Sequence, residues 1–587
     1  MLNPRIYRAA FLPVFVAVVA LAFSFQNEPA ALGTNLAPAA FNGQAAFSQL
    51  ENLASHYPNR RPGSRGDSGL ATKVASLLGA HGIGFSVSTQ TFDARTVDGT
   101  RRLETVTAEQ QGSSSGRIVV VAHRDALGAH ATADLSGTAT LIELARVLAG
   151  RTLNRTVDLI STSGSAGLAG ATQLAANLGG PIDAVIVLGD VAGTHVSEPV
   201  VVPWSGAANL APPLLRDTAA GAVRGQSALA PGGADVASQF ARLAFPLTLS
   251  EQGPFNTLGI PAVLLSRGGE RGPGANAPVS EAALAGLGGA ALQTISALDG
   301  GPDIPPPSAY LLYKHMTVPA WPIRLLVLTL MLPVLCAAVD GFARARRRGH
   351  TVGRWAGWVL ATALPFALAF FFLFALGALG LVPAAAPGPV AAGDVPVPFG
   401  AAVEIAAAVL VLVLAMFPIR TFIVRRLDRH GEANEPGGAA ALLLVMCALA
   451  LVVWFQNPFA AALIVPALHL WMWIVEPEVR LRTPLAVALL LVGLAPVALV
   501  ILYYATQFDL GPLGVGWTGM LLIAGGGIAV VTLLEWSIFA GCAVSVALIA
   551  ARASRQAAPE AAPVTVRGPI TYAGPGSLGG TKSALRR

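Results

Sequence analysis

The stretch Arg117-Ile118-Val119-Val120-Val121-Ala122-His123-Arg124-Asp125 determines the architecture of the first half of the chain. Its five consecutive aliphatic residues predict a strand buried on both faces, and the polar residues after them mark the end of that strand. Further along the chain, the pattern predicts a helix over 137–149 and strands over 156–161, 184–188 and 262–265. Strands separated by helices predict an α/β domain with a mostly parallel sheet and helices on both faces.

The chain as a whole is too apolar for an ordinary soluble enzyme. Of its 587 residues, 54% are hydrophobic and 12% are charged, and the mean hydropathy is +0.61. Soluble domains have about a quarter charged residues, and disordered chains and coiled coils also depend on charge, so the composition excludes all three. Cys336, Cys447 and Cys542 lie in apolar runs, which excludes a disulfide framework and a cysteine-rich zinc site.

Apolar segments long enough to cross a membrane precede and follow the α/β domain. The first predicts an N-terminal transmembrane anchor in residues 1–25, followed by the α/β domain at 26–319 and an all-α membrane domain at 320–551. Seven spans are expected in the membrane domain, with eight as the alternative, at 321–342, 355–382, 400–423, 438–455, 458–475, 484–505 and within 514–551. Residues 552–587, rich in Ala, Pro, Gly and Ser, predict a disordered tail.

Basic loops set the expected orientation. Loops with several arginines are 344–354, 420–429 and 480–482, and loops without Lys or Arg are 383–399, 456–457 and 506–513. This alternation predicts a cytoplasmic N-terminus and tail, with residues 26–319 extracytoplasmic, in a multi-pass protein of the plasma (cytoplasmic) membrane. The expected partner is the lipid bilayer and not nucleic acid. Arg outnumbers Lys by 35 to 3, which is typical of a GC-rich bacterial genome.

Four motifs stand in a fixed order within residues 50–300. They are His56-Tyr57-Pro58-Asn59-Arg60-Arg61-Pro62-Gly63-Ser64, the strand ending in His123-Arg124-Asp125, Leu135-Ser136-Gly137-Thr138 before a helix, and Pro254-Phe255 followed by Gly259-Ile260-Pro261-Ala262. This set resembles the zinc-dependent aminopeptidase/glutamate-carboxypeptidase-like exopeptidases, here fused to a multi-span membrane domain. By architecture alone, the chain is also similar to the GPI-transamidase attachment subunit.

The resemblance to the zinc exopeptidases implies a site in which two zinc ions share a carboxylate and a water, and a Glu takes the proton of that water. By position, the first His ligand falls on His123, and Asp125 matches the carboxylate that orients this ring. The bridging Asp falls on Ala133, beside Asp134, and a further Asp ligand falls on Asp190.

Two parts of the implied site have no counterpart. The adjacent Glu pair, which supplies a ligand and the general base, should precede Gly167-Leu168-Ala169-Gly170, but residues 163–166 read Ser-Gly-Ser-Ala. The last His should follow the 262–265 strand, where Asn276 is the nearest polar candidate. The resemblance therefore implies a degenerate metal site with no catalytic residue assigned. No cofactor is expected, with zinc as the alternative.

These gaps favour a pseudo-enzyme, whose exported domain keeps the fold and binds a peptide terminus or a partner membrane protein. The second hypothesis is an active metallo-aminopeptidase with a rearranged single-zinc site around His123, Asp134 and Asp190, to which His130 would add a ligand.

Three ionisable residues lie within or near apolar spans, namely Glu404, His469 and Glu535. Such residues are candidates for function because charges are costly in lipid. For His469 a hydrogen bond between helices is the expected role. A transport or lipid-handling protein, with the exported domain as an accessory, is the third hypothesis.

Overall fold

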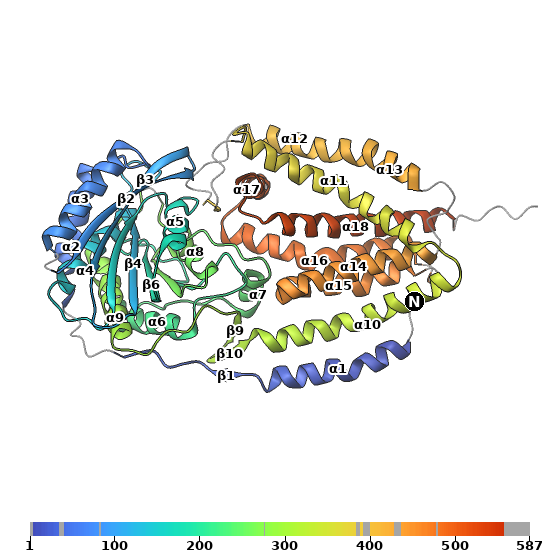
Figure 1. Cartoon of the computed structure of the whole chain (residues 1–587), viewed down its shortest axis with the longest axis horizontal. Helices are drawn as coiled ribbons and strands as arrows, with labels where there is room; N and C mark the ends of the chain where they lie inside the picture. Colours follow the sequence, from blue (N-terminus) through green and yellow to red (C-terminus); the bar gives the residue numbers. More distant parts are fainter. Residues whose placement is uncertain are drawn as a thin grey trace, which may run out of the picture.

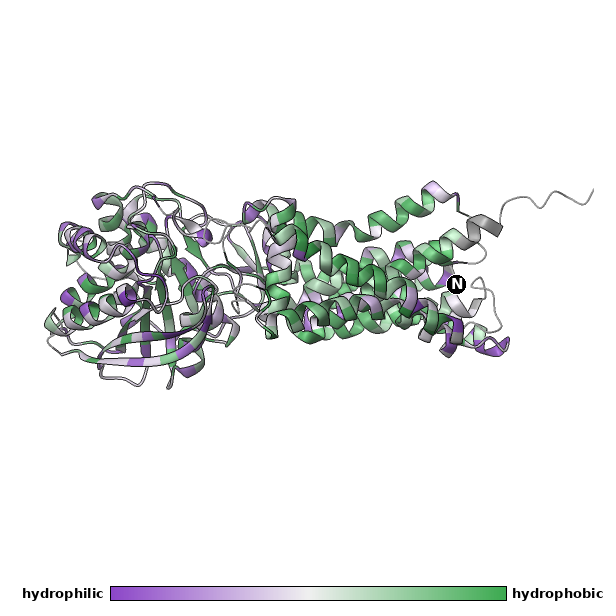
Figure 2. Cartoon of the chain, turned by 90° about the horizontal axis from the view of Figure 1, so that it is seen from above, coloured by the Kyte–Doolittle hydropathy of each residue, from purple (hydrophilic) through white to green (hydrophobic). Residues whose placement is uncertain are grey.

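In the computed structural model, the chain forms an α/β domain at one end of a bundle of long helices (Figure 1). The structure describes residues 4–33, 40–81, 84–274, 276–382, 388–390, 400–427, 436–476, 479 and 481–556. Hydrophobic residues dominate the length of the bundle, whereas hydrophilic residues are frequent on the domain and at the far end of the bundle (Figure 2). This distribution is the one expected for membrane helices that carry a water-exposed domain.

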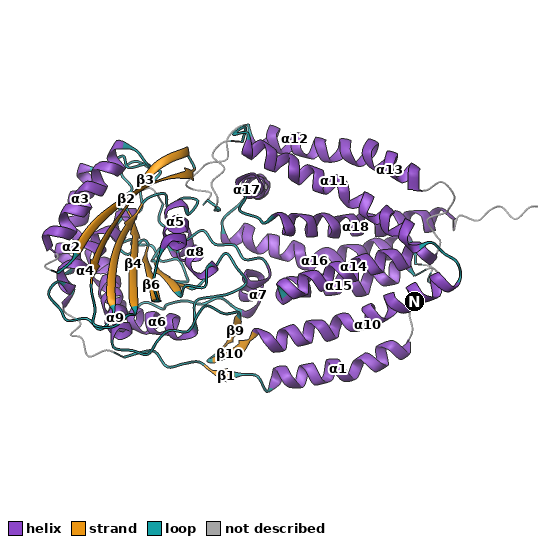
Figure 3. Ribbon diagram, in the orientation of Figure 1, coloured by secondary structure: helices purple, strands orange, loops and turns teal. Residues whose placement is uncertain are grey.

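A seven-stranded sheet forms the centre of the domain, in the order β2-β3-β5-β4-β6-β8-β7 (Figure 3). Its strands are β2 (Ser86–Thr96), β3 (Gly99–Gln110), β4 (Arg117–His123), β5 (Thr156–Thr162), β6 (Ile182–Leu188), β7 (Val201–Val202) and β8 (Ala262–Leu265). The central strands β5, β4, β6 and β8 run parallel, while β2, β3 and β7 pair antiparallel with their neighbours. The predicted α/β class is confirmed, and the sheet as a whole is mixed.

Helices cover both faces of the sheet because the aliphatic side chains of its central strands alternate between two cores. On β4, Ile118 and Val120 belong to one core and Val119 and Val121 to the other, and all four are fully buried. The first core also contains residues of α2 (Gly43–His56), α3 (Arg65–His81), α4 (Ser136–Leu148), α6 (Pro213–Ser227) and α9 (Glu281–Asp299). The second contains residues of α5 (Ala169–Asn177), α7 (Val236–Ala244) and α8 (Gln252–Thr257).

Helix α4 begins close against the end of β6, and glycine makes this approach feasible. A Cβ atom at Gly137 would collide with the carbonyl oxygen of Leu188. Ser136, the residue before it, donates to the Ala133 carbonyl at 2.5 Å and accepts from the Val191 amide at 2.9 Å. The Leu-Ser-Gly motif therefore fixes the start of α4 beside the edge of the sheet where polar residues gather.

Among the described residues, eight helices are long and apolar enough to cross a membrane, which indicates a multi-pass membrane protein. They are α1 (Pro4–Ala22), α10 (Ala320–Arg347), α11 (Val352–Ala378), α12 (Ala401–Leu414) continued by α13 (Arg420–Leu427), α14 (Pro436–Gln456), α15 (Pro458–Val475), α16 (Thr483–Gln507) and α18 (Val530–Gln556). A π-helical turn that contains Pro418, which lacks an N–H group, joins α12 to α13. The shorter apolar helix α17 (Pro512–Gly525) precedes α18.

A small antiparallel sheet connects the domain to the bundle. Its strands β1 (Gln26–Asn27), β10 (Met316–Pro319) and β9 (Tyr310–Tyr313) lie where α1 enters the domain and where the chain leaves it for α10 (Figure 1). The second core of the domain also continues without interruption into the buried residues of α10, α11, α14 and α15. Domain and bundle therefore share one packed interior.

Candidate functional site

The predicted site residues lie at the carboxyl ends of the parallel strands, the usual place for ligands in open α/β sheets. His123 ends β4, Ser163 and Ser165 follow β5, and Asp190 follows β6. These ends border a cleft with a free volume of about 90 Å³. Its lining includes His123, Asp134, Ser165, Asp190, Glu251, Ser266, Glu270 and Arg271. Three of the predicted residues, His123, Asp134 and Asp190, are thus brought to one cleft.

His123 forms an ion pair with Glu251, a residue to which none of the sequence motifs pointed. The imidazole Nδ1 lies 3.0 Å from Glu251 Oε2, and the Thr162 hydroxyl donates to Glu251 Oε1 at 3.2 Å. Burial lowers the pKa of His123, but Glu251, together with Asp125 and Asp134, outweighs this effect and raises the pKa to about 9. The pairing with Glu251 thus favours the protonated imidazolium form of His123 at neutral pH, and a metal at this ring would have to displace that proton.

Asp125 is held by the segment that replaces the expected Glu pair. Its carboxylate accepts from the Ser165 amide at 3.1 Å and from the Ser165 hydroxyl at 3.1 Å. The side chain is fully buried, and this burial raises the pKa of Asp125 to about 6. Asp125 therefore fixes the loop after β5, in addition to its electrostatic effect on His123.

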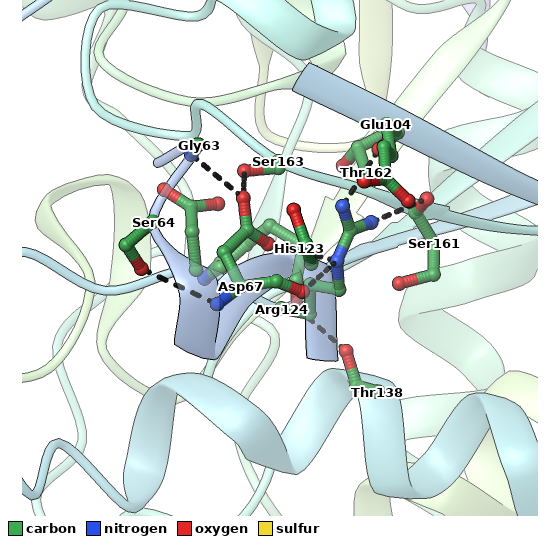
Figure 4. A network of polar contacts seen from close by, with 12 residues as sticks. Gly63, Ser64, Asp67, Glu104, His123, Arg124, Thr138, Ser161, Thr162 and Ser163 are labelled. Carbon is green, nitrogen blue, oxygen red and sulfur yellow. Dashed lines mark hydrogen bonds and ion pairs between the residues drawn. The ribbon is translucent and has the colours of Figure 1, made fainter. Parts of the chain in front are cut away.

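A second buried carboxylate, Asp67, lies in a network of polar contacts beside His123 (Figure 4). Arg124 Nε lies 2.9 Å from Asp67 Oδ1, and both side chains are almost completely buried. Asp67 Oδ2 accepts from the Ser163 hydroxyl at 2.5 Å and from the Gly63 amide at 2.9 Å. Asp67 thus anchors α3 to the end of β4 and contacts the preceding Arg-Pro-Gly-Ser motif through Gly63, which adopts a positive φ of 68° that favours glycine.

The remaining predicted residues of the domain divide between the cleft and the surface. Asp190 is buried and its Oδ1 accepts from the amides of Ala192 at 3.1 Å and Gly193 at 2.7 Å, while burial raises its pKa. Asp134 lines the cleft from the turn before α4. His130 and Asn276 are exposed and do not line the cleft.

These residues do not fit the zinc site that the resemblance implies. Asp190 Oδ1 accepts two backbone hydrogen bonds, and His123 Nδ1 is paired with Glu251, which leaves Nε2 as the ring atom that could bind a metal. Within the parts of the chain that the structure describes, no three His, Cys, Asp or Glu side chains are grouped so that they could hold a metal ion. Structural zinc takes four ligands from the protein, and catalytic zinc takes three.

A segment from the membrane half also borders the cleft. Pro389 and Val390, which follow α11 in the chain, are among the lining residues. The Gly388 amide donates to the carbonyl of Gly167 at 3.0 Å, in the loop between β5 and α5. The cleft is therefore built from both halves of the protein.

The three ionisable candidates of the bundle lie apart from the cleft lining. His469 on α15 contacts Tyr7 on α1 at 3.3 Å through Nδ1, and its Nε2 lies 2.9 Å from the Leu330 carbonyl on α10. Since a carbonyl only accepts, Nε2 donates and Nδ1 accepts from Tyr7, which joins three helices. Glu535 accepts from Gln456 at 2.6 Å, and Glu404 lies in the first turn of α12.

The comparison with protein-family models agrees with the motifs in the domain. Residues 105–276 match the sequence model of Peptidase family M28. Among solved structures, glutaminyl cyclase from Porphyromonas gingivalis is 18% identical over 44% of this chain and 98% of its own, with a TM-score of 0.32. The aminopeptidase from Aneurinibacillus sp. strain AM-1 is 13% identical over 44% of this chain and 95% of its own, with a TM-score of 0.35.

A Zn-dependent exopeptidase from Parabacteroides distasonis is 17% identical over 44% of this chain and 99% of its own, with a TM-score of 0.34. No curated protein sequence matches the chain. The predicted resemblance to zinc exopeptidases is confirmed by the match to the family model. The chain is thus a membrane-type helical bundle joined to an α/β domain, of which residues 105–276 match Peptidase family M28.

Proposed function

We propose that this chain is a multi-pass protein of a bacterial cytoplasmic membrane whose extracytoplasmic domain uses a peptidase-derived cleft for binding and not for hydrolysis. Residues 1–25 act as an uncleaved anchor, 26–319 as the binding domain, 320–551 as the membrane domain and 552–587 as a cytoplasmic tail. The ligand is a peptide terminus or a segment of a partner membrane protein.

One observation carries this proposal, the buried ion pair between His123 and Glu251. A His that binds a metal is neutral, and the ion pair with Glu251, which raises the pKa of His123 to about 9, favours the protonated form instead. The segment that should supply the general base offers Ser163 and Ser165, which donate to Asp67 and Asp125. The family's reactive carboxylates are thus replaced by groups that fix the shape of the cleft.

Basic residues at the end of the bundle away from the domain support the proposed orientation. The last turn of α10 carries Arg344, Arg346 and Arg347, and this end of the helix lies away from the domain (Figure 1). Positive residues accumulate on the cytoplasmic side of membrane proteins, which leaves the domain on the opposite side.

Metal content and peptide hydrolysis test the loss of chemistry. We expect the full-length protein, purified in detergent, to contain less than about a tenth of an equivalent of zinc by elemental analysis, unchanged in His123→Ala. Peptides with free amino termini should remain intact. One equivalent of zinc that is lost in the variant, together with hydrolysis, would instead support the rearranged single-zinc enzyme.

Binding is tested by photo-crosslinking on intact membranes. Benzoylphenylalanine placed at Ala166, which lines the cleft, should capture a specific peptide or membrane protein. The same photoreactive side chain at Thr91, exposed on β2, serves as the control. Equal products from both positions would contradict a binding role for the cleft.

A further inference from the structure

The end of α7 is held by the bundle. Asn457, between α14 and α15, donates to the carbonyls of Leu243 at 2.7 Å and Ala244 at 3.3 Å. Tyr504 on α16 donates to the carbonyl of Phe245 at 2.5 Å. Three consecutive carbonyls at the end of an extramembrane helix are therefore satisfied by side chains of the membrane helices, which is the capping that helix ends require.

Arg242, also on α7, is buried at this junction. Its guanidinium forms a two-pronged ion pair with Glu270, and both side chains are at most 2% exposed. Nε donates to the Tyr503 hydroxyl on α16 at 2.9 Å. Aromatic rings surround the guanidinium, with centroids 5.1 Å away for Trp204, 5.4 Å for Tyr504 and 5.6 Å for Phe508. The planar, forked guanidinium makes all these contacts at once, which fixes its position between α16 and Glu270.

The same ion pair reaches the cleft. Glu270 lines the cleft, and its Oε1 accepts from the amide of Leu249 at 3.1 Å. Arg242 also donates to the Leu247 carbonyl at 2.8 Å. Two residues beyond Leu249 stands Glu251, the partner of His123. A continuous set of contacts therefore leads from α16 through Arg242 and Glu270 to the acidic edge of the cleft.

We propose that Arg242 is a positioning residue through which α16 sets the geometry of the Leu249–Glu251 edge of the cleft. This inference rests on the proposed binding function and adds that α16 regulates ligand binding in the cleft. A ligand that displaces Glu251 must also disturb the contacts on α16. Coupling of this kind is reciprocal, so a change in the bundle alters the cleft by the same free energy.

Hydrogen–deuterium exchange of the full-length protein in detergent tests the inference without a ligand. Tyr503→Phe keeps the ring beside Arg242 and removes only the hydroxyl. We expect the exchange of amides in residues 247–252 to rise about tenfold, since a hydrogen bond to a charged group is lost. Amides of β4 and β6 should be unchanged. Tyr7→Phe is the matched control, because it removes a hydroxyl contact within the bundle that does not involve α16.

A double variant extends the test. Arg242→Met with Glu270→Met removes both charges and leaves no unpaired ion, so the domain should still fold. The double variant should raise exchange in 247–252 at least as much as Tyr503→Phe. Arg242→Lys, with Glu270 intact, should keep part of the protection that the double variant loses. Unchanged exchange in 247–252, or an equal rise throughout the sheet, overturns the positioning role. If exchange shows no positioning role but crosslinking from Ala166 persists, the binding function still stands. If the rise in exchange is confined to 247–252 but Ala166 captures no ligand, only the binding function is overturned.

Discussion

Replacing Arg124 with Met should lower the thermal midpoint of the α/β domain by on the order of 10 °C. Arg124 is fully buried and pairs with Asp67, and it also donates to the carbonyls of Ser161 at 3.2 Å and Glu104 at 2.7 Å. Without the guanidinium, the buried Asp67 carboxylate has lost its paired cation and two carbonyls have lost a donor. Breaking one side of such a pair costs about 3–5 kcal/mol.

Two further variants separate this cause from a general loss of contacts. Arg61→Met removes an ion pair with Asp98 in which the arginine is half exposed, so its effect should stay within about 1 kcal/mol. Arg124→Met combined with Asp67→Leu removes both charges and should recover much of the lost stability. The measurement is tryptophan fluorescence during heating in detergent. A single Arg124→Met variant as stable as Arg61→Met would refute the assigned role of the pair.

The central strands and the membrane helices were predictable because both are continuous apolar segments. The predicted strand at 262–265 coincides with β8, and the predicted span at 458–475 coincides with α15. The hairpin of β2 and β3 was not predicted. Most of β2 is exposed on both faces, so its sequence lacks the alternation that marks a half-buried strand.

The candidate site residues depend on motifs that lie at the ends of recognisable strands and at the start of a helix. The resemblance to zinc exopeptidases assigns His123 and Asp190, which lie at or just after the ends of β4 and β6, and it points to Asp134 beside the start of α4. Glu251 was missed because it lies 128 residues from His123 and no local pattern links the two. The one feature of the sequence that points to Glu251 is its position three residues before the Pro254-Phe255 motif. Conversely, only its position after the 262–265 strand makes Asn276 a candidate, and the structure places it at the surface.

Raising the pH from 7 to 10 should destabilise the wild-type domain more than a His123→Gln variant. The folded-state pKa of His123 is raised to about 9 from the ordinary value of 6.5. A raised pKa means that the stabilisation is fully present below pH 6.5 and is lost as the pH rises through 9. The difference in pKa corresponds to about 3 kcal/mol. Asp125, with a pKa of about 6, is mainly ionised at pH 7 and contributes little over this interval.

The His123→Gln variant isolates the ion pair, because the glutamine amide would still donate a hydrogen bond to Glu251 but cannot titrate. Thermal midpoints of both proteins, measured in detergent at intervals of pH, should converge or cross as the wild type loses its imidazolium charge. Parallel curves for the two proteins would show that His123 is neutral in the folded state. In that case its nitrogen would have a lone pair available for a metal, and the rearranged single-zinc enzyme would become the better account of the cleft.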